Sequence, residues 1–82
     1  MNETEIKQQA QRYSLVVQWS DRDRVYIVSL PEWEQSGLIG HTHGATVEEA
    51  VHMGKELLDL LIEGRLADGE PLPEPRVYAS AS

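Results

Sequence analysis

Residues 44–64 read GATVEEAVHMGKELLDLLIEG and predict one long amphipathic helix. Thr46 can accept a hydrogen bond from the backbone N–H of Glu49, while the Glu49 side chain reaches back to the Thr46 N–H, which is a capping box. Apolar residues at helical spacing predict one stripe that lies on the domain core. The stripe consists of Val47, Ala50, Val51, Gly54, Leu58 and Leu61.

The same helix carries more apolar side chains than one buried face needs. Met53, Leu57 and Leu60 form a second stripe beside the first, and Ile62 widens the other edge. A domain of 82 residues has little surface of its own to cover them. Large exposed apolar patches usually mark association surfaces. We therefore expect the second stripe to contact a partner or a second copy; the alternative is a deep groove within the domain.

Upstream of the helix, three short segments predict an antiparallel meander. Residues 13–20 and 25–30 are rich in β-branched and aromatic side chains, and the charged turn 21–24 joins them. Residues 38–44 predict a weaker third strand after a loop at 32–37. A close approach of the helix to this sheet would explain the glycine in mid-helix at position 54.

The chain leaves the helix through either Gly64 or Asp68-Gly69, and three prolines between 71 and 75 then force an extended path. Residues 76–79 predict a last strand. We expect an α+β fold, a small two-layer β-β-β-α-β domain whose mostly antiparallel sheet is covered by one helix. Residues 1–12 would form a flexible or weakly helical arm, 13–79 the single domain, and 80–82 a frayed tail.

Charge limits the choice of partner. The net charge is −7, and residues 46–75 carry eight acidic and two basic side chains. Binding to a phosphate backbone needs clustered Lys and Arg, so we expect no direct nucleic-acid binding. A basic protein partner suits this charge, although negative charge also keeps a small protein soluble. The acidic N-terminus, the lack of cysteine and the lack of a long apolar run favour a cytoplasmic protein without a membrane span.

No sequence motif indicates catalysis, so we expect neither an enzyme nor a cofactor. His41 and His43 would share one strand face and could share a metal ion, but two histidines are too few for a stable site. Asp21 and Asp23 are better explained as turn residues. Trp33 is a candidate contact residue; the alternative, a position in the core or as a lid over the core edge, is the safer interpretation.

Three segments together resemble a known family. Residues 25–32 read VYIVSLPE, residues 43–50 read HGATVEEA, and residues 68–75 read DGEPLPEP. In this order they resemble the HicB-type antitoxin family, in its short single-domain form, over Tyr13 to Tyr78. Two departures are that Glu32 stands where members typically have Asp, and that residues 34–37 replace a Pro-Gly pair.

The resemblance implies a degenerate ribonuclease-H-like unit without nuclease activity. Such a unit binds and masks a small basic RNA-cleaving toxin of the HicA type, and it tends to self-associate. Many members also carry a C-terminal DNA-binding domain; the sequence after Tyr78 has no room for one, so operator binding is not expected. The alternative function is an orphan homo-oligomeric structural or regulatory protein without a toxin partner.

Overall fold

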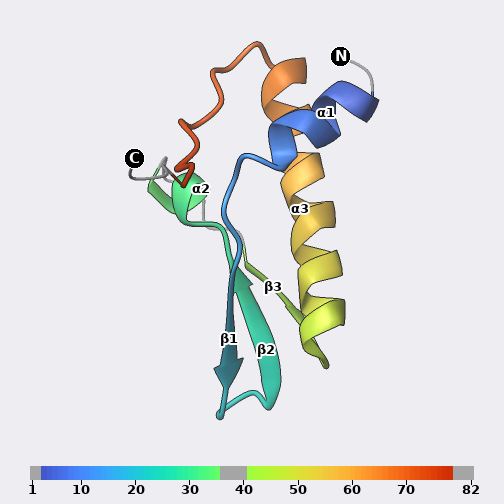
Figure 1. Ribbon diagram of the computed structural model, residues 1–82, viewed down its shortest axis with the longest axis vertical. Coiled ribbons are helices and arrows are strands. Elements are labelled where there is room, and N and C mark those ends of the chain that lie inside the picture. Colours follow the sequence, from blue (N-terminus) through green and yellow to red (C-terminus); the bar gives the residue numbers. More distant parts are fainter. Residues whose placement is uncertain (1–2, 36–40, 79–82) are drawn as a thin grey trace.

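The computed structural model describes residues 3–35 and 41–78. Its three strands form one antiparallel sheet in the order β1-β2-β3, and the longest helix lies along one face of that sheet (Figure 1). The α+β class and the meander are therefore confirmed. The elements are α1 (Glu3–Ala10), β1 (Val16–Ser20), β2 (Val25–Ser29), α2 (Pro31–Gln35), β3 (His41–Gly44) and α3 (Val47–Ala67).

The strand register assigns side chains to the two faces of the sheet. Val28 pairs with Val17 on β1 and with Thr42 on β3, and it is completely buried beneath α3. Directly paired residues project on the same face, and the face alternates along each strand. Ile27 and His43, which also pair, therefore lie on the face turned away from α3.

Glycines allow α3 to approach the sheet closely. A Cβ atom on Gly54 would lie 2.8 Å from Cγ1 of Val28 and 3.2 Å from Cδ2 of Leu15. A Cβ atom on Gly44 would collide with the backbone of Ala50 in the first turn of α3. The predicted close approach at Gly54 is confirmed, because any larger side chain there would push the helix off β2.

Short-range signals define both ends of α3. The Thr46 hydroxyl accepts a hydrogen bond of 3.1 Å from the Glu49 backbone N–H, as predicted. At the other end, Gly69 adopts a φ of 70°, in the left-handed region that favours glycine. The Glu70 N–H bonds to the Arg65 carbonyl at 2.9 Å, which completes a Schellman motif. Of the two predicted ends, the Asp68-Gly69 end is the one observed.

The buried face of α3 differs from the predicted stripe. Its buried residues are Ala50, Gly54, Leu58 and Ile62, each four positions after the last. Steps of four residues drift around a helix by about 40° each, so the buried line rotates from the sheet toward the other helices. Ile62 is completely buried, and Val47, which we expected in the core, is 45% exposed.

The core cluster lies where the helices meet beyond the sheet. Around its buried side chains pack partly buried residues from α1, from α3 and from the segment after α3, including Ile6, Leu57 and Leu72. Figure 1 shows α1 against the C-terminal half of α3 and the last segment running down past α2. The centre of the cluster consists of Tyr13, Leu30, Trp33, Leu58 and Ile62.

Two segments outside the sheet form helices, of which the first was expected to be at most weakly helical and the second was not expected. Residues 3–10, expected as an arm or a weak helical turn, form α1. Residues 31–35, placed by the sequence at a strand end and in a loop, form the short helix α2. The Leu30 carbonyl accepts the N–H groups of Trp33 and Glu34 at 3.1 and 3.0 Å, and Pro31 occupies the first helical position, where it is favoured.

The predicted last strand is wrong for the part of it that is described. Residues 71–78 are extended but pair with no strand, and position 79 lies outside the described residues. The Arg76 N–H, which a strand would use in a ladder, instead bonds to the carboxylate of Glu32 at 3.0 Å. The segment is held by separate contacts: the Arg65 guanidinium donates to the Pro71 carbonyl at 3.1 Å, and the Tyr13 hydroxyl to the Pro73 carbonyl at 2.5 Å.

Glu32 joins three segments that are distant in sequence. Its side chain extends from α2 and the residue is 2% exposed. Both carboxylate oxygens accept from the Ser14 N–H at 3.1 Å, and one of them also accepts from the Ser14 hydroxyl and from the Arg76 N–H. One charged group on α2 therefore bonds to both the residues before β1 and the C-terminal segment.

The hydrogen bonds also decide the charge state of this group. Burial alone raises the pKa of the Glu32 carboxyl, because a low dielectric disfavours the charged form. The N–H groups of Arg76, of Glu32 itself and of Ser14 stabilise the carboxylate and outweigh burial, so its pKa lies below the ordinary value. The same carboxylate, together with burial as the larger cause, raises the pKa of Tyr13.

Replacing Glu32→Gln should cost about 1.5–3 kcal/mol of unfolding free energy at neutral pH, because charged hydrogen bonds are lost in a buried place. The folded-state pKa is depressed, so the stabilisation is complete above about pH 4.3 and is lost as the pH falls through the folded value. Urea unfolding followed by circular dichroism from about pH 7 to pH 3 should therefore show the gap between wild type and variant closing in acid. Glu34→Gln, a change at an exposed site of the same helix, is the matched control; equal effects of the two substitutions would contradict the assignment.

Candidate partner-binding surface

The second apolar stripe of α3 is only partly covered by the domain. Leu60 is 66% exposed and Met53 is 37% exposed, whereas Leu57 is half-buried and packs against the core cluster. We call Met53, Leu57 and Leu60 the α3 ridge. Leu57 anchors the ridge in the domain, and Met53 and Leu60 present apolar surface to solvent.

A row of carboxylates borders the ridge. Glu49, Glu56 and Glu63 follow one another at intervals of seven residues, and all three are exposed. Seven residues make nearly two helical turns, so these side chains lie in one line along α3. Glu56 also pairs with the exposed His52 at 3.0 Å, as the four-residue spacing suggests. The sequence predicted that these glutamates lie on the polar face of the helix. Their spacing of seven residues is the feature of the sequence that indicates a row.

Trp33, the fourth candidate contact residue, is in the core. It is 1% exposed, its ring lies 5.5 Å from that of Tyr13, and the Arg65 guanidinium lies 5.6 Å from its ring centroid. The indole therefore lies beneath α2 and is not presented to a partner. Its neighbours Tyr13 and Arg65 connect α2 to the residues before β1 and to α3.

His41 and His43 lie on the sheet face opposite α3, as their register with Ser29 and Ile27 requires. Both are exposed, and the His41 Nε2 atom lies 3.1 Å from a carboxylate oxygen of Glu34. Within residues 3–35 and 41–78, no three His, Asp or Glu side chains converge as a metal site would require. The two histidines thus share a face as predicted.

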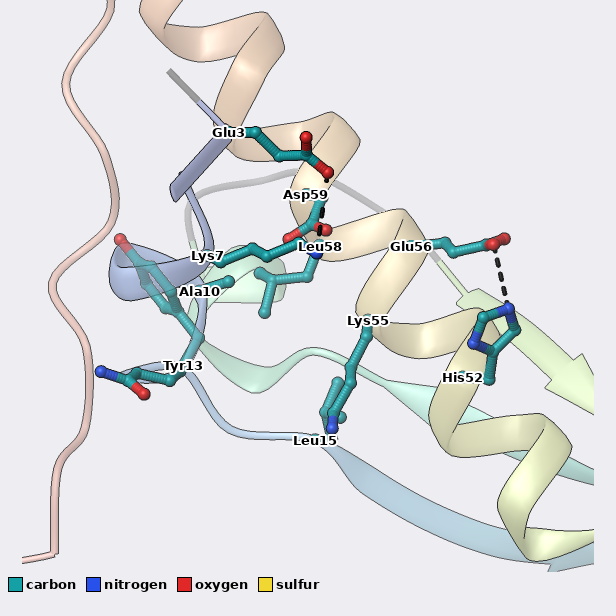
Figure 2. Close-up of a pocket in the computed structure, with 11 residues that line it drawn as sticks. Glu3, Lys7, Ala10, Tyr13, Leu15, His52, Lys55, Glu56, Leu58 and Asp59 are labelled. Atoms are coloured by element: carbon teal, nitrogen blue, oxygen red, sulfur yellow. Dashed lines mark ion pairs between the residues drawn. The ribbon is translucent and has the colours of Figure 1, made fainter. Parts of the chain in front are cut away.

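A hollow of about 750 Å³ lies between α1, α3 and the residues before β1 (Figure 2). Its floor includes Tyr13, Leu15 and Leu58, and its rim is charged. Figure 2 shows two ion pairs on this rim: Lys7 lies 3.6 Å from Glu3, and His52 pairs with Glu56. Small-molecule pockets are mostly apolar with few polar groups. The mixed charge of this rim does not match that pattern.

The parts of the chain that the structure describes include no helix of the length and apolarity that crossing a membrane requires. The exposed large apolar side chains of α3 are Val47 at its first turn and Met53 and Leu60 of the ridge, and the ridge lies beside the acidic row. It therefore resembles a protein-contact surface in composition.

The contrast between Leu60 and Ile62 can be tested directly. Leu60→Glu should change the unfolding free energy by less than about 0.5 kcal/mol, since its side chain is mostly in water. Ile62→Ala should cost about 2–5 kcal/mol, because it leaves a cavity in the core. Urea unfolding of both variants measures the difference; equal losses would mean that Leu60 belongs to the core.

Comparison with known proteins adds no relative: no family model, curated protein or solved structure matches this chain. The likeness to the HicB-type antitoxins therefore rests on the residues quoted above alone.

Proposed function

We propose that this chain is an antitoxin-like protein-binding module that neutralises a small basic RNA-cleaving toxin by covering its active site. The observation that carries the proposal is the α3 ridge, an exposed apolar line beside a row of carboxylates. A toxin that cleaves RNA needs a basic surface for phosphates. An acidic surface with apolar contacts complements such a surface and competes with RNA for it.

The charge distribution supports this partner class. Electrostatic complementarity accelerates encounter and selects against partners of like charge, while apolar contacts near the centre of an interface supply most of the affinity. The ridge and the acidic row place both contributions on one helix. The resemblance to HicB-type antitoxins names the corresponding partner, a HicA-type toxin.

The domain supports a preformed interface. The ridge belongs to a helix of 21 residues that is capped at both ends and fixed to the core through Leu58 and Ile62. A surface that is ordered before binding loses little conformational entropy on association. The module therefore resembles a rigid inhibitor more than a segment that folds on its target.

Self-association is the second candidate, and the sheet favours it. β1 and β3 are both edge strands, and no further strand pairs with either in the described parts of the chain. Exposed edges can pair with a second copy. An orphan homo-oligomeric structural or regulatory protein would use these edges and have no toxin.

Co-expression tests the proposed function. Any small basic protein encoded beside this chain should arrest growth when produced alone, and growth should recover when the two are produced together. With purified proteins, RNA cleavage by the neighbour should stop at about equimolar addition, as expected for tight binding of one partner. A catalytically inactive version of the neighbour controls for general burden. A harmless neighbour, or toxicity that persists with this chain in excess, would contradict the proposal.

A further inference from the structure

We propose that the α3 ridge docks one basic amphipathic helix of the partner, lying along α3, and does not pair with a second copy of this chain. The inference rests on the proposed function in so far as that helix belongs to the toxin. The ridge, the acidic row and the positions of the basic side chains on α3 each contribute one step.

The ridge has the shape that an adjacent helix needs. Met53, Leu57 and Leu60 are separated by four and three residues, the spacing that forms one line on a helix. Gly64 and Ala67 continue the line with small side chains, and a Cβ atom on Gly64 would meet nothing within 4 Å. From Met53 to Ala67 the line is about 21 Å long. It offers an apolar seam about two heptads long, with room for close approach at its C-terminal end.

The charge beside the ridge selects the partner. Glu49, Glu56 and Glu63 repeat every seven residues, as do charges that flank the seam of paired helices. Within the described parts of the chain, Glu56 pairs with the exposed His52, and exposed pairs are weak. A helix with lysines or arginines along one flank of its apolar stripe would meet all three carboxylates.

Basic side chains of α3 itself cannot supply this complement. Of lysine and arginine the helix contains two, Lys55 and Arg65, and its His52 contacts Glu56 of the row. Lys55 lines the hollow beside α1, where Figure 2 shows it extending toward Leu15. Arg65 lies over the Trp33 ring and donates to the Pro71 carbonyl. Neither reaches the ridge.

A second copy is therefore a poor occupant. An antiparallel pair of α3 helices would set one glutamate row against the other, and like charges in contact disfavour association. A parallel pair would set each row against the opposite flank, where Ala50 and Leu61 face the domain and carry no charge. Any self-association would use another surface, such as the sheet edges.

Two synthetic helices of 21 residues provide the probe. One carries leucines at heptad positions a and d with lysines at e and g, and its twin carries glutamates in place of the lysines. Fluorescence anisotropy should show the lysine helix binding the full chain at least about tenfold more tightly than its twin. Raising the salt from about 0.05 M to 0.5 M should weaken that binding several-fold, because screening shortens the reach of the carboxylates.

Leu60→Glu and Val77→Glu make a matched pair, since each adds one negative charge and removes an exposed apolar side chain; Val77 is 55% exposed. Leu60→Glu should weaken binding of the lysine helix at least about tenfold, and Val77→Glu less than twofold. Equal effects, or no binding by the wild type, would overturn the inference. So would a wild-type dimer in sedimentation that Leu60→Glu alone dissolves.

The inference and the proposed function fail in different ways. If Leu60→Glu neutralises the neighbouring toxin as well as the wild type does, the toxin is held elsewhere and this inference is wrong, while the function stands. If the lysine helix binds as expected and no toxin is neutralised, the ridge is a basic-helix site and the antitoxin assignment is wrong.

Discussion

The carboxylate of Glu32 accepts hydrogen bonds from Ser14, 18 positions before it, and from Arg76, 44 positions after it. These bonds stabilise the charge in a place where burial would otherwise remove it. A chain of this size buries only about 60% of its unfolded surface, so its apolar core leaves a small margin of stability. The Glu32 hydrogen bonds hold together three parts of the fold: the residues before β1, the helix α2 and the C-terminal segment.

That closure determines which side of α3 remains available. α1, α2 and the segment after α3 pack around Trp33 and Ile62. The sheet packs against the N-terminal half of α3 at Gly54. Together they cover a face that rotates along the helix. The ridge lies outside that face, and the glutamate row lies farther round. The packing of the domain thus leaves the ridge uncovered, and the ridge lies beside the glutamate row, whose charge selects a basic partner.

Features coded by neighbouring residues could be predicted from the sequence. The Thr46 cap, the stop at Asp68-Gly69 and the first hairpin depend on side chains within a few positions, and each is present.

The sequence could not predict that Ile62 is in the core and Val47 is not. Helical spacing predicts a stripe of buried residues, but it does not show how packing against α1 and α2 rotates the buried face along α3. The role of Glu32 left no signal, since an acid after a proline in a first helical turn is ordinary. The predicted last strand was wrong because the Arg76 N–H bonds to the Glu32 carboxylate, which is 44 positions away and left no signal in the local sequence. For the candidate site, Met53 and Leu60 were identified from the excess of apolar residues. For Trp33 the alternative of a core position is the one observed, and the sequence could not show that much of Leu57 is covered.

Residue-resolved amide hydrogen exchange, followed by NMR near neutral pH, tests the closure by Glu32 most directly. If the carboxylate holds the fold together, the Ser14 and Arg76 amides should be protected to a degree approaching that of Leu58 and Ile62 in the core. Both should lose protection in Glu32→Gln while the centre of α3 keeps more of it. Exchange of the Arg76 amide at the rate of an unstructured chain in the wild type, with α3 fully protected, would contradict the account.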